Sequence, residues 1–209
     1  MESNESFAHT ESHVHRDGEG VKIGIWLFLF AELVLFGGMF IVYTVYRFKY
    51  PDQFHLAAME MNTTFGTINT IILLTGSLTM VLSIAAIQRK NRFLSILFVA
   101  STIFFGLLFL VNKFIEWSNE IGKGIYPGSD ALLKKGNGEV LFFDLYFAMT
   151  GLHGLHVFIG IIVLTFMLVF LLKNKIVFDN YIKLENSGLY WHLVVVIWIF
   201  LFPLFYLIQ

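Results

Sequence analysis

The chain has 209 residues, of which 57% are hydrophobic and 14% are charged, so it is too apolar for a soluble domain of its size. Its formal net charge of −1 provides no basic surface for nucleic acid, which is excluded as a partner. The absence of cysteine excludes disulfides, thiolate-bound iron–sulfur clusters and cysteine nucleophiles. The sequence therefore predicts an integral membrane protein in which any redox cofactor would depend on histidine or methionine.

Residues 1–21 form a polar segment that is rich in acidic residues and contains His9, His13 and His15. Its apolar content is too low to build a packed core, so we expect a disordered tail rather than a metal site. No positively charged start, short apolar run and cleavage site precede the first apolar segment, which we therefore expect to remain in the protein.

Five apolar segments follow the tail, at residues 23–46, 64–87, 93–117, 140–172 and 189–207. Each is long enough to cross a hydrocarbon core about 30 Å thick. The predicted fold is therefore all-α, with five transmembrane helices in one membrane domain at residues 22–209. The connections between these segments are too short to hold a soluble domain.

Lysine and arginine predict the orientation, because they concentrate in cytoplasmic loops. They are more numerous in the tail and the even-numbered connections than in the odd-numbered ones, and three of them lie in the tight turn Arg89-Lys90-Asn91-Arg92. We expect the N-terminus to be cytoplasmic and Gln209 to be periplasmic, with the chain in a bacterial inner membrane.

Glu32 lies about ten residues after Lys22, near the middle of the first span. A carboxyl group at that depth is costly unless it is protonated or paired. Two interpretations stay open: a neutral acid that hydrogen-bonds between helices, or a site that relays protons or contacts lipid head groups.

Lys113 and Glu116 lie near the end of the third span and are three residues apart, so they are neighbours on a helix and can neutralise one another. We interpret them as a structural pair rather than a transport site. Asn69, in the second span, is a small hydrogen-bonding residue suited to helix packing.

The histidines of the spans are His153, His156 and His192. His153 and His156 lie on one side of one helix, so they cannot both bind one haem iron from opposite faces. A haem would need one of them together with His192. We favour packing or lipid hydrogen bonds over a haem site or a three-histidine metal site. Gly151 and Gly154 lie on the same side and predict a close helix contact.

Several motifs follow one another along the chain. The main ones are Gly24-Ile25-Trp26-Leu27-Phe28 with Glu32, Asn69-Thr70-Ile71-Ile72-Leu73-Leu74-Thr75, Lys113-Phe114-Ile115-Glu116-Trp117, Gly151-Leu152-His153-Gly154-Leu155-His156 and Tyr190-Trp191-His192-Leu193-Val194. They cover nearly the whole membrane domain and are specific as a set. Together and in this order they resemble subunit III of the haem–copper oxidases, the cytochrome c oxidase subunit III family, in its short five-span bacterial form.

The resemblance implies a subunit of the respiratory chain that holds no haem, copper or catalytic residue of its own. It would pack against the catalytic subunit I, with subunit II and other subunits nearby, and the haem and copper would lie in those partners. Oxygen reduction in aerobic electron transport would occur there, with cytochrome c or quinol as the electron donor.

The resemblance also implies bound phospholipid, in a cleft between the first two helices and the remaining ones, with Glu32 at that cleft. Glu32, His153, His156 and His192 would support lipid binding or proton uptake. Asn69, Lys113 and Glu116 would make structural polar contacts.

One position departs from the family, because Val195 stands where an acidic residue usually follows the Trp-His motif. The C-terminal Phe202-Pro203-Leu204-Phe205-Tyr206-Leu207 also resembles the subunit-III-like accessory proteins of nitric oxide reductase. That branch is the main alternative, and an independent membrane cytochrome or a small transporter are the others.

Overall fold

The computed structural model describes the backbone of residues 2–174, 176 and 181–207, and the side chains of residues 23 onward within these ranges. Contacts within the chain divide it into two units, residues 1–37 and residues 38–209. The first unit is one continuous helix, the N-terminal part of α1 (Glu2–Lys49). Helix α1 includes the polar segment that the sequence predicts as a disordered tail, and the division of the chain at residue 22 stays a prediction.

Five helices of the described chain are long and apolar enough to cross a membrane, which confirms the predicted number of spans. They are Ile23–Lys49, Thr63–Gln88, Arg92–Gly122, Asn137–Leu172 and Ile182–Leu207. The remaining regular structure in the described chain is also helical, so the all-α class is confirmed.

The spans extend further than the apolar segments predict, because polar and charged residues continue the helices at their ends. The third helix runs five residues past Trp117, and the fifth begins at Ile182 instead of Leu189. Two short helices, α2 (Pro51–Met59) and α5 (Asp130–Leu133), occupy connections expected to be loops. Proline suits the first helical position of α2, and α2 buries Phe54, Ala57 and Ala58.

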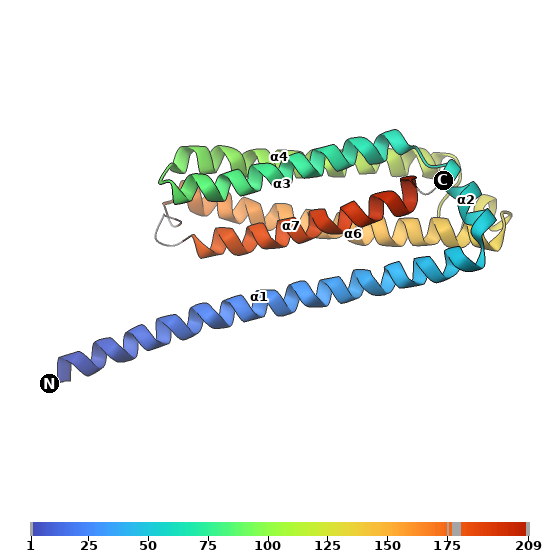
Figure 1. Cartoon of the computed structure of the whole chain (residues 1–209). Helices are drawn as coiled ribbons and strands as arrows, with labels where there is room; N and C mark the ends of the chain where they lie inside the picture. The colour runs from blue at the N-terminus through green and yellow to red at the C-terminus, as the bar shows by residue number, and fades with distance from the viewer. Residues whose placement is uncertain (1, 175, 177–180, 208–209) are drawn as a thin grey trace. The chain divides into compact units, whose positions relative to one another are not determined.

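The second unit is built around four long helices, α3 (Thr63–Gln88), α4 (Arg92–Gly122), α6 (Asn137–Leu172) and α7 (Ile182–Phe202), which lie side by side in Figure 1. Helix α3 packs against both α4 and α7, and α6 packs against α4 and α7. The lipid cleft expected between the first two spans and the remaining ones stays a prediction. The second span belongs to the four-helix bundle, because it buries a face that includes Ile72, Leu73 and Met80.

Trp191 of α7 fills the centre of this bundle and is 0% exposed. Glycines from the three other long helices make room for its ring: a Cβ added to Gly106 of α4 would lie 2.8 Å from the ring, and one added to Gly160 of α6 would lie 3.1 Å from it. Gly76 of α3 is also close, at 3.8 Å. Close approach of the four helices thus depends on small residues around one large aromatic side chain.

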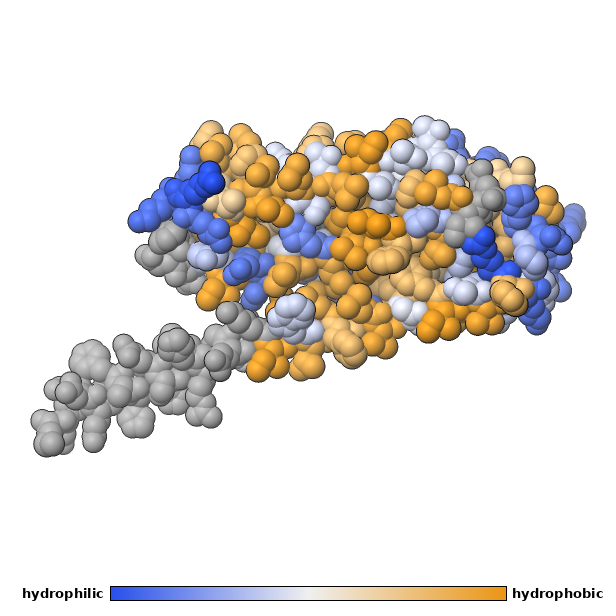
Figure 2. Space-filling model, in the orientation of Figure 1, coloured by the Kyte–Doolittle hydropathy of each residue, from blue (hydrophilic) through white to orange (hydrophobic). Residues whose placement is uncertain are grey.

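Apolar side chains cover the long side of the bundle seen in Figure 2, and hydrophilic residues gather toward its two ends. Large apolar side chains that are exposed on the long helices include Ile71, Leu78, Phe104 and Phe166. The pattern is the one expected where hydrocarbon, rather than water, surrounds the helices.

Candidate functional site: a buried polar cluster

Four polar side chains meet inside the second unit and define the polar cluster: Lys113 and Glu116 of α4, Tyr146 of α6 and Tyr206 near the C-terminus. The side chains of Lys113 and Glu116 are only 6% and 3% exposed. Lys113 Nζ lies 3.2 Å from Glu116 Oε2, as the spacing of three residues on a helix allows. The pair therefore lies between helices and not at an exposed helix end.

The two tyrosines complete the hydrogen bonding of the pair. Lys113 Nζ donates to the Tyr146 hydroxyl at 2.9 Å and to the Tyr206 hydroxyl at 2.7 Å. Each tyrosine in turn donates to Glu116 Oε1, at 2.6 Å from Tyr146 and 2.5 Å from Tyr206. An ammonium group has three donors, and here all three are used. The charges are neutralised within the cluster, which makes their burial tolerable.

Tyr206 reaches the cluster because the last helix changes its geometry. Pro203 has no backbone N–H, which interrupts the α-helical ladder. The chain continues as the π-helical turn η1 (Pro203–Leu207). Two side chains from other helices hold this turn: Tyr43 of α1 donates to the Leu204 carbonyl at 2.5 Å, and Thr63 donates to the Tyr206 carbonyl at 3.3 Å.

Aromatic rings lie close to the lysine of the polar cluster. Lys113 Nζ lies 4.5 Å from the centroid of the Tyr146 ring and 5.5 Å from that of Trp198. The Trp198 ring also packs on Phe109 at 4.9 Å. Cation–π attraction strengthens where water is excluded, so these rings add to the stabilisation of the lysine charge.

His153 is fully buried and lies between two aromatic rings, with centroid distances of 5.2 Å to Trp198 and 5.5 Å to Phe109. Its ring nitrogens make no hydrogen bond within the described residues. His153 thus contributes an aromatic packing surface next to the polar cluster.

His156 and His192 lie in other environments. His156 Nδ1 bonds the Leu152 carbonyl of its own helix at 2.8 Å. His192 Nδ1 lies 2.8 Å from the Ser77 hydroxyl and so links α7 to α3. The structure does not gather the three histidines around one point. Among the described residues, no group of three or more His, Cys, Asp or Glu side chains could hold a metal ion.

Asn69 joins α3 to α4 through a side-chain hydrogen bond. The Asn112 amide donates to Asn69 Oδ1 at 2.7 Å, and Asn69 is fully buried. A further bond links α7 to α3, because the Trp198 indole donates to the Thr70 hydroxyl at 3.0 Å. Such bonds between membrane helices fix which faces meet.

The prediction for the paired glycines is half correct. A Cβ added to Gly151 would lie 3.0 Å from the Trp117 ring, whereas one added to Gly154 would meet nothing within 4 Å. A second close contact on α6 lies at Gly160, where an added Cβ would be 3.1 Å from the Trp191 ring.

The sequence analysis missed Tyr146 and Tyr206, although both were visible as polar residues in apolar runs. A useful signal was the lysine itself, because one carboxylate leaves donors of a buried ammonium unsatisfied and further acceptors must lie nearby. Val195 is 2% exposed on α7. It adds an apolar side chain to the bundle interior where an acidic one was expected.

Glu32 lies within the membrane-spanning part of α1, in the first unit. Its position relative to the bundle, and so to the proposed lipid cleft, stays a prediction.

These features define a multi-pass helical membrane protein whose buried polar residues bond to one another between the spans. The sequence model for cytochrome c oxidase subunit III matches residues 1–209. The chain belongs to this family.

Individual relatives agree with the family assignment. Cytochrome c oxidase subunit 3 of Alkalihalophilus pseudofirmus is 30% identical, over 94% of this chain and 92% of its own length. Probable quinol oxidase subunit 3 of Staphylococcus epidermidis is 28% identical, over 95% of this chain and 93% of its own. Heme-copper oxidase subunit I+III of Aeropyrum pernix is 29% identical over 90% of this chain, which spans only 23% of that longer protein.

Proposed function

We propose that this chain is a non-catalytic subunit III of a respiratory haem–copper oxygen reductase and that it packs directly on subunit I. The observation that carries the proposal is the Aeropyrum relative. Its name joins subunits I and III, and the aligned region, which is 29% identical, covers 90% of this chain. Fusion of two subunits in one chain favours their direct contact in related complexes. Haem and copper would lie in the partner subunits, and subunit II would complete the enzyme.

The polar cluster would serve this role as a structural element. It joins α4, α6 and η1 through charged hydrogen bonds whose donors and acceptors lie within the subunit. A subunit that presents an apolar side to lipid and to other spans needs such internal bonds, because contact with hydrocarbon alone does not select one helix arrangement.

Glu32 would provide lipid binding or support for proton uptake, since a carboxyl group at mid-membrane is a functional candidate by default. We infer that His153, His156 and His192 act through packing and helix contacts. His153 packs between aromatic rings, and the other two have hydrogen-bond partners within the second unit.

Orientation and compartment complete the proposal. The turn with Arg89, Lys90 and Arg92 would lie on the cytoplasmic side of a bacterial inner membrane, with the N-terminus on the same side and Gln209 in the periplasm. The electron donor would be cytochrome c or quinol, and relatives with both kinds of name match this chain.

Copurification tests the proposed partnership. An affinity-tagged chain, extracted from its source organism in mild detergent, is expected to recover a subunit I of an oxygen reductase in equal amount. Recovery of a nitric oxide reductase catalytic subunit would favour the alternative assignment, and recovery of no haem-containing partner would contradict both.

Labelling and substitution test Glu32. A hydrophobic carbodiimide is expected to modify Glu32, because the reagent partitions into the hydrocarbon where this carboxyl group is expected to lie. Glu32→Ala should shorten the active lifetime of the complex or slow proton uptake while the haem spectrum stays intact. Glu32→Gln then separates the two interpretations, since an amide preserves hydrogen bonding but cannot relay a proton. Label found only on loop acids such as Glu60 would refute the mid-membrane assignment.

A further inference from the structure

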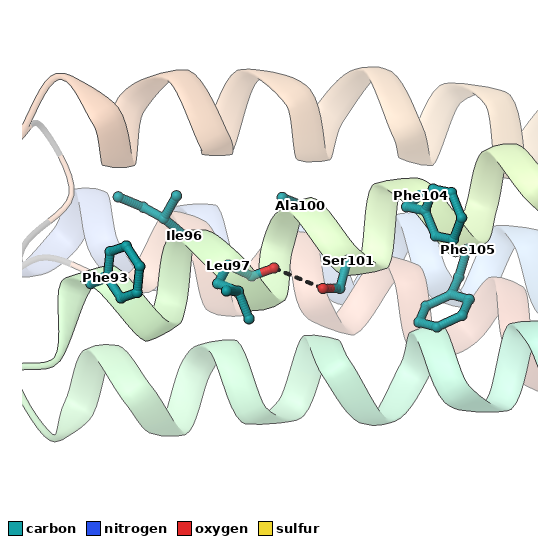
Figure 3. Close-up of a pocket in the computed structure, with 7 residues that line it drawn as sticks. All are labelled: Phe93, Ile96, Leu97, Ala100, Ser101, Phe104 and Phe105. Atoms are coloured by element: carbon teal, nitrogen blue, oxygen red, sulfur yellow. Dashed lines mark hydrogen bonds between the residues drawn. The ribbon is translucent and has the colours of Figure 1, made fainter.

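Two hollows lie on the surface of α4 near the turn that joins it to α3. The larger, of about 480 Å³, is lined by Phe93, Ile96, Leu97, Ala100, Ser101, Phe104 and Phe105. Figure 3 shows these side chains along α4, with the Ser101 hydroxyl bonded to the Leu97 carbonyl of the same helix, at 2.9 Å. Its polar group is thus already used, and nothing at this hollow identifies a ligand.

The second hollow differs because it combines an apolar floor with a cation. It measures about 360 Å³ and lies between α3 and α4, with Leu82, Ala85 and Ala86 on one side and Leu94 and Phe98 on the other. Arg89 and Asn91, from the turn itself, line it as well. We name this hollow, with its seven lining residues, the turn groove.

Arg89 is available to bind an anion. It is exposed, and its guanidinium makes no hydrogen bond or ion pair with any residue that the structure describes. The sequence from Met61 to Ile115, which contains all of α3 and most of α4, has no aspartate or glutamate that could neutralise it. An unpaired arginine therefore lines the groove where α3 ends.

Arg92 of the same turn is engaged elsewhere. Its Nε donates to the Leu171 carbonyl and its Nη2 to the Leu172 carbonyl, each at 2.8 Å. These bonds satisfy carbonyls at the C-terminal end of α6, where a positive charge is also favourable. This contact fixes the turn against α6 and leaves Arg89 as the cation that lines the groove.

We propose that the turn groove binds an anionic phospholipid, with its phosphate on Arg89 and an acyl chain against Leu82, Ala85, Leu94 and Phe98. Charge complementarity selects the occupant: the turn carries three cations at the end of two spans, and a guanidinium matches a phosphate group with paired donors. The apolar floor continues from that cation along both spans, as an acyl chain would. This site is separate from Glu32 and does not depend on which oxidase subunits are partners.

Photocrosslinking tests the proposal on the tagged chain together with the subunits that copurify with it. The sample is placed in phosphatidylcholine nanodiscs that contain phosphatidylglycerol or phosphatidylcholine with a photoreactive group in one acyl chain. Peptide mass spectrometry then measures the label on residues 82–98. We expect labelling by phosphatidylglycerol to exceed that by phosphatidylcholine about fivefold, the effect of one cation near the bilayer surface.

Substitutions assign the preference to Arg89. Arg89→Gln should bring the two lipids to equal labelling, whereas Arg89→Lys should retain part of the difference. Lys134→Gln is the matched control, because Lys134 is also an exposed cation that forms no ion pair with the residues that the structure describes, but it lies in another connection, between α5 and α6. It should leave the ratio unchanged.

Three results would overturn the proposal: equal labelling of the unaltered chain by both lipids, an unchanged preference in Arg89→Gln, or no lipid label because another subunit covers the groove. Ala85→Phe adds a check on the acyl site. It should reduce the label from both lipids, and unchanged labelling would place the acyl chain elsewhere.

Discussion

Removing one charge of the polar cluster should destabilise the protein strongly. Glu116→Leu leaves Lys113 with two tyrosine oxygens but no counter-charge, and at 4% exposure water cannot replace the carboxylate. Breaking a buried pair from one side costs about 3–5 kcal/mol. Each kcal/mol lowers the melting temperature of a chain of this size by about 2–4 °C, so we expect a decrease of roughly 6–20 °C.

Removing both charges together should cost much less. In Lys113→Met/Glu116→Leu no unpaired charge remains, and apolar replacement of a buried pair is often close to neutral. The hydroxyls of Tyr146 and Tyr206 lie 3.5 Å apart and can then bond to each other. The double variant should therefore recover most of the melting temperature that the single variants lose.

Thermal unfolding of the detergent-solubilised chain, followed by tryptophan fluorescence, measures these effects. Lys134→Met is the matched control, because it makes the same substitution at an exposed lysine outside the polar cluster. Its loss leaves no buried partner without a counter-charge, so it should change the free energy of unfolding by less than about 0.5 kcal/mol. Equal effects of Lys134→Met and Lys113→Met, or a double variant that loses the sum of the single losses, would refute the reasoning.

Two further predictions concern packing and alkaline pH. Gly106→Ala would bring a methyl group to 2.8 Å from Trp191 and should cost about 1–3 kcal/mol, whereas Gly154→Ala, with nothing within 4 Å, should be close to neutral; similar melting temperatures for both variants would contradict this. Lys135 lies outside the spans. Burial lowers its pKa, but hydrogen bonds and charges from Glu60 and Glu139 outweigh burial, so that the pKa is raised. A raised pKa in the folded protein gives stability that is present below the ordinary lysine value of about 10.4 and is lost as pH rises through the folded value. The melting temperature should therefore fall less steeply above that pH in Lys135→Gln than in the unaltered chain, and parallel curves would contradict the contribution of Lys135.

The number of spans could be predicted from the sequence because hydrocarbon imposes a minimum apolar length that each segment meets. The ends could not, because helices continue into polar residues at the membrane edge. Residues 182–188 illustrate this: they carry Lys183 and Glu185, which hydropathy assigns to a loop, yet they belong to α7.

The polar contacts were only partly predictable, because a pair within one helix follows from spacing and a contact between helices does not. Lys113 and Glu116 could be recognised as neighbours from their separation of three residues. Tyr146 and Tyr206 are 33 and 93 residues from Lys113. Their arrival depends on how α6 packs and on the π-helical turn after Pro203, which no local pattern encodes.

The glycines show the same limit. Gly151 and Gly154 are three residues apart and so lie on one side of α6, but a close contact also needs a partner opposite the glycine. Trp191 is that partner for Gly160 and Gly106, which stand outside the motif.

The most direct measurement of the central claim is a reduced-minus-oxidised haem spectrum, recorded on the copurified complex and on the chain expressed and purified alone. The account predicts stoichiometric haem in the complex and none in the isolated, folded chain, because this subunit supports a redox centre held by its partner. Stoichiometric haem in the isolated chain would contradict the account and identify an independent membrane cytochrome.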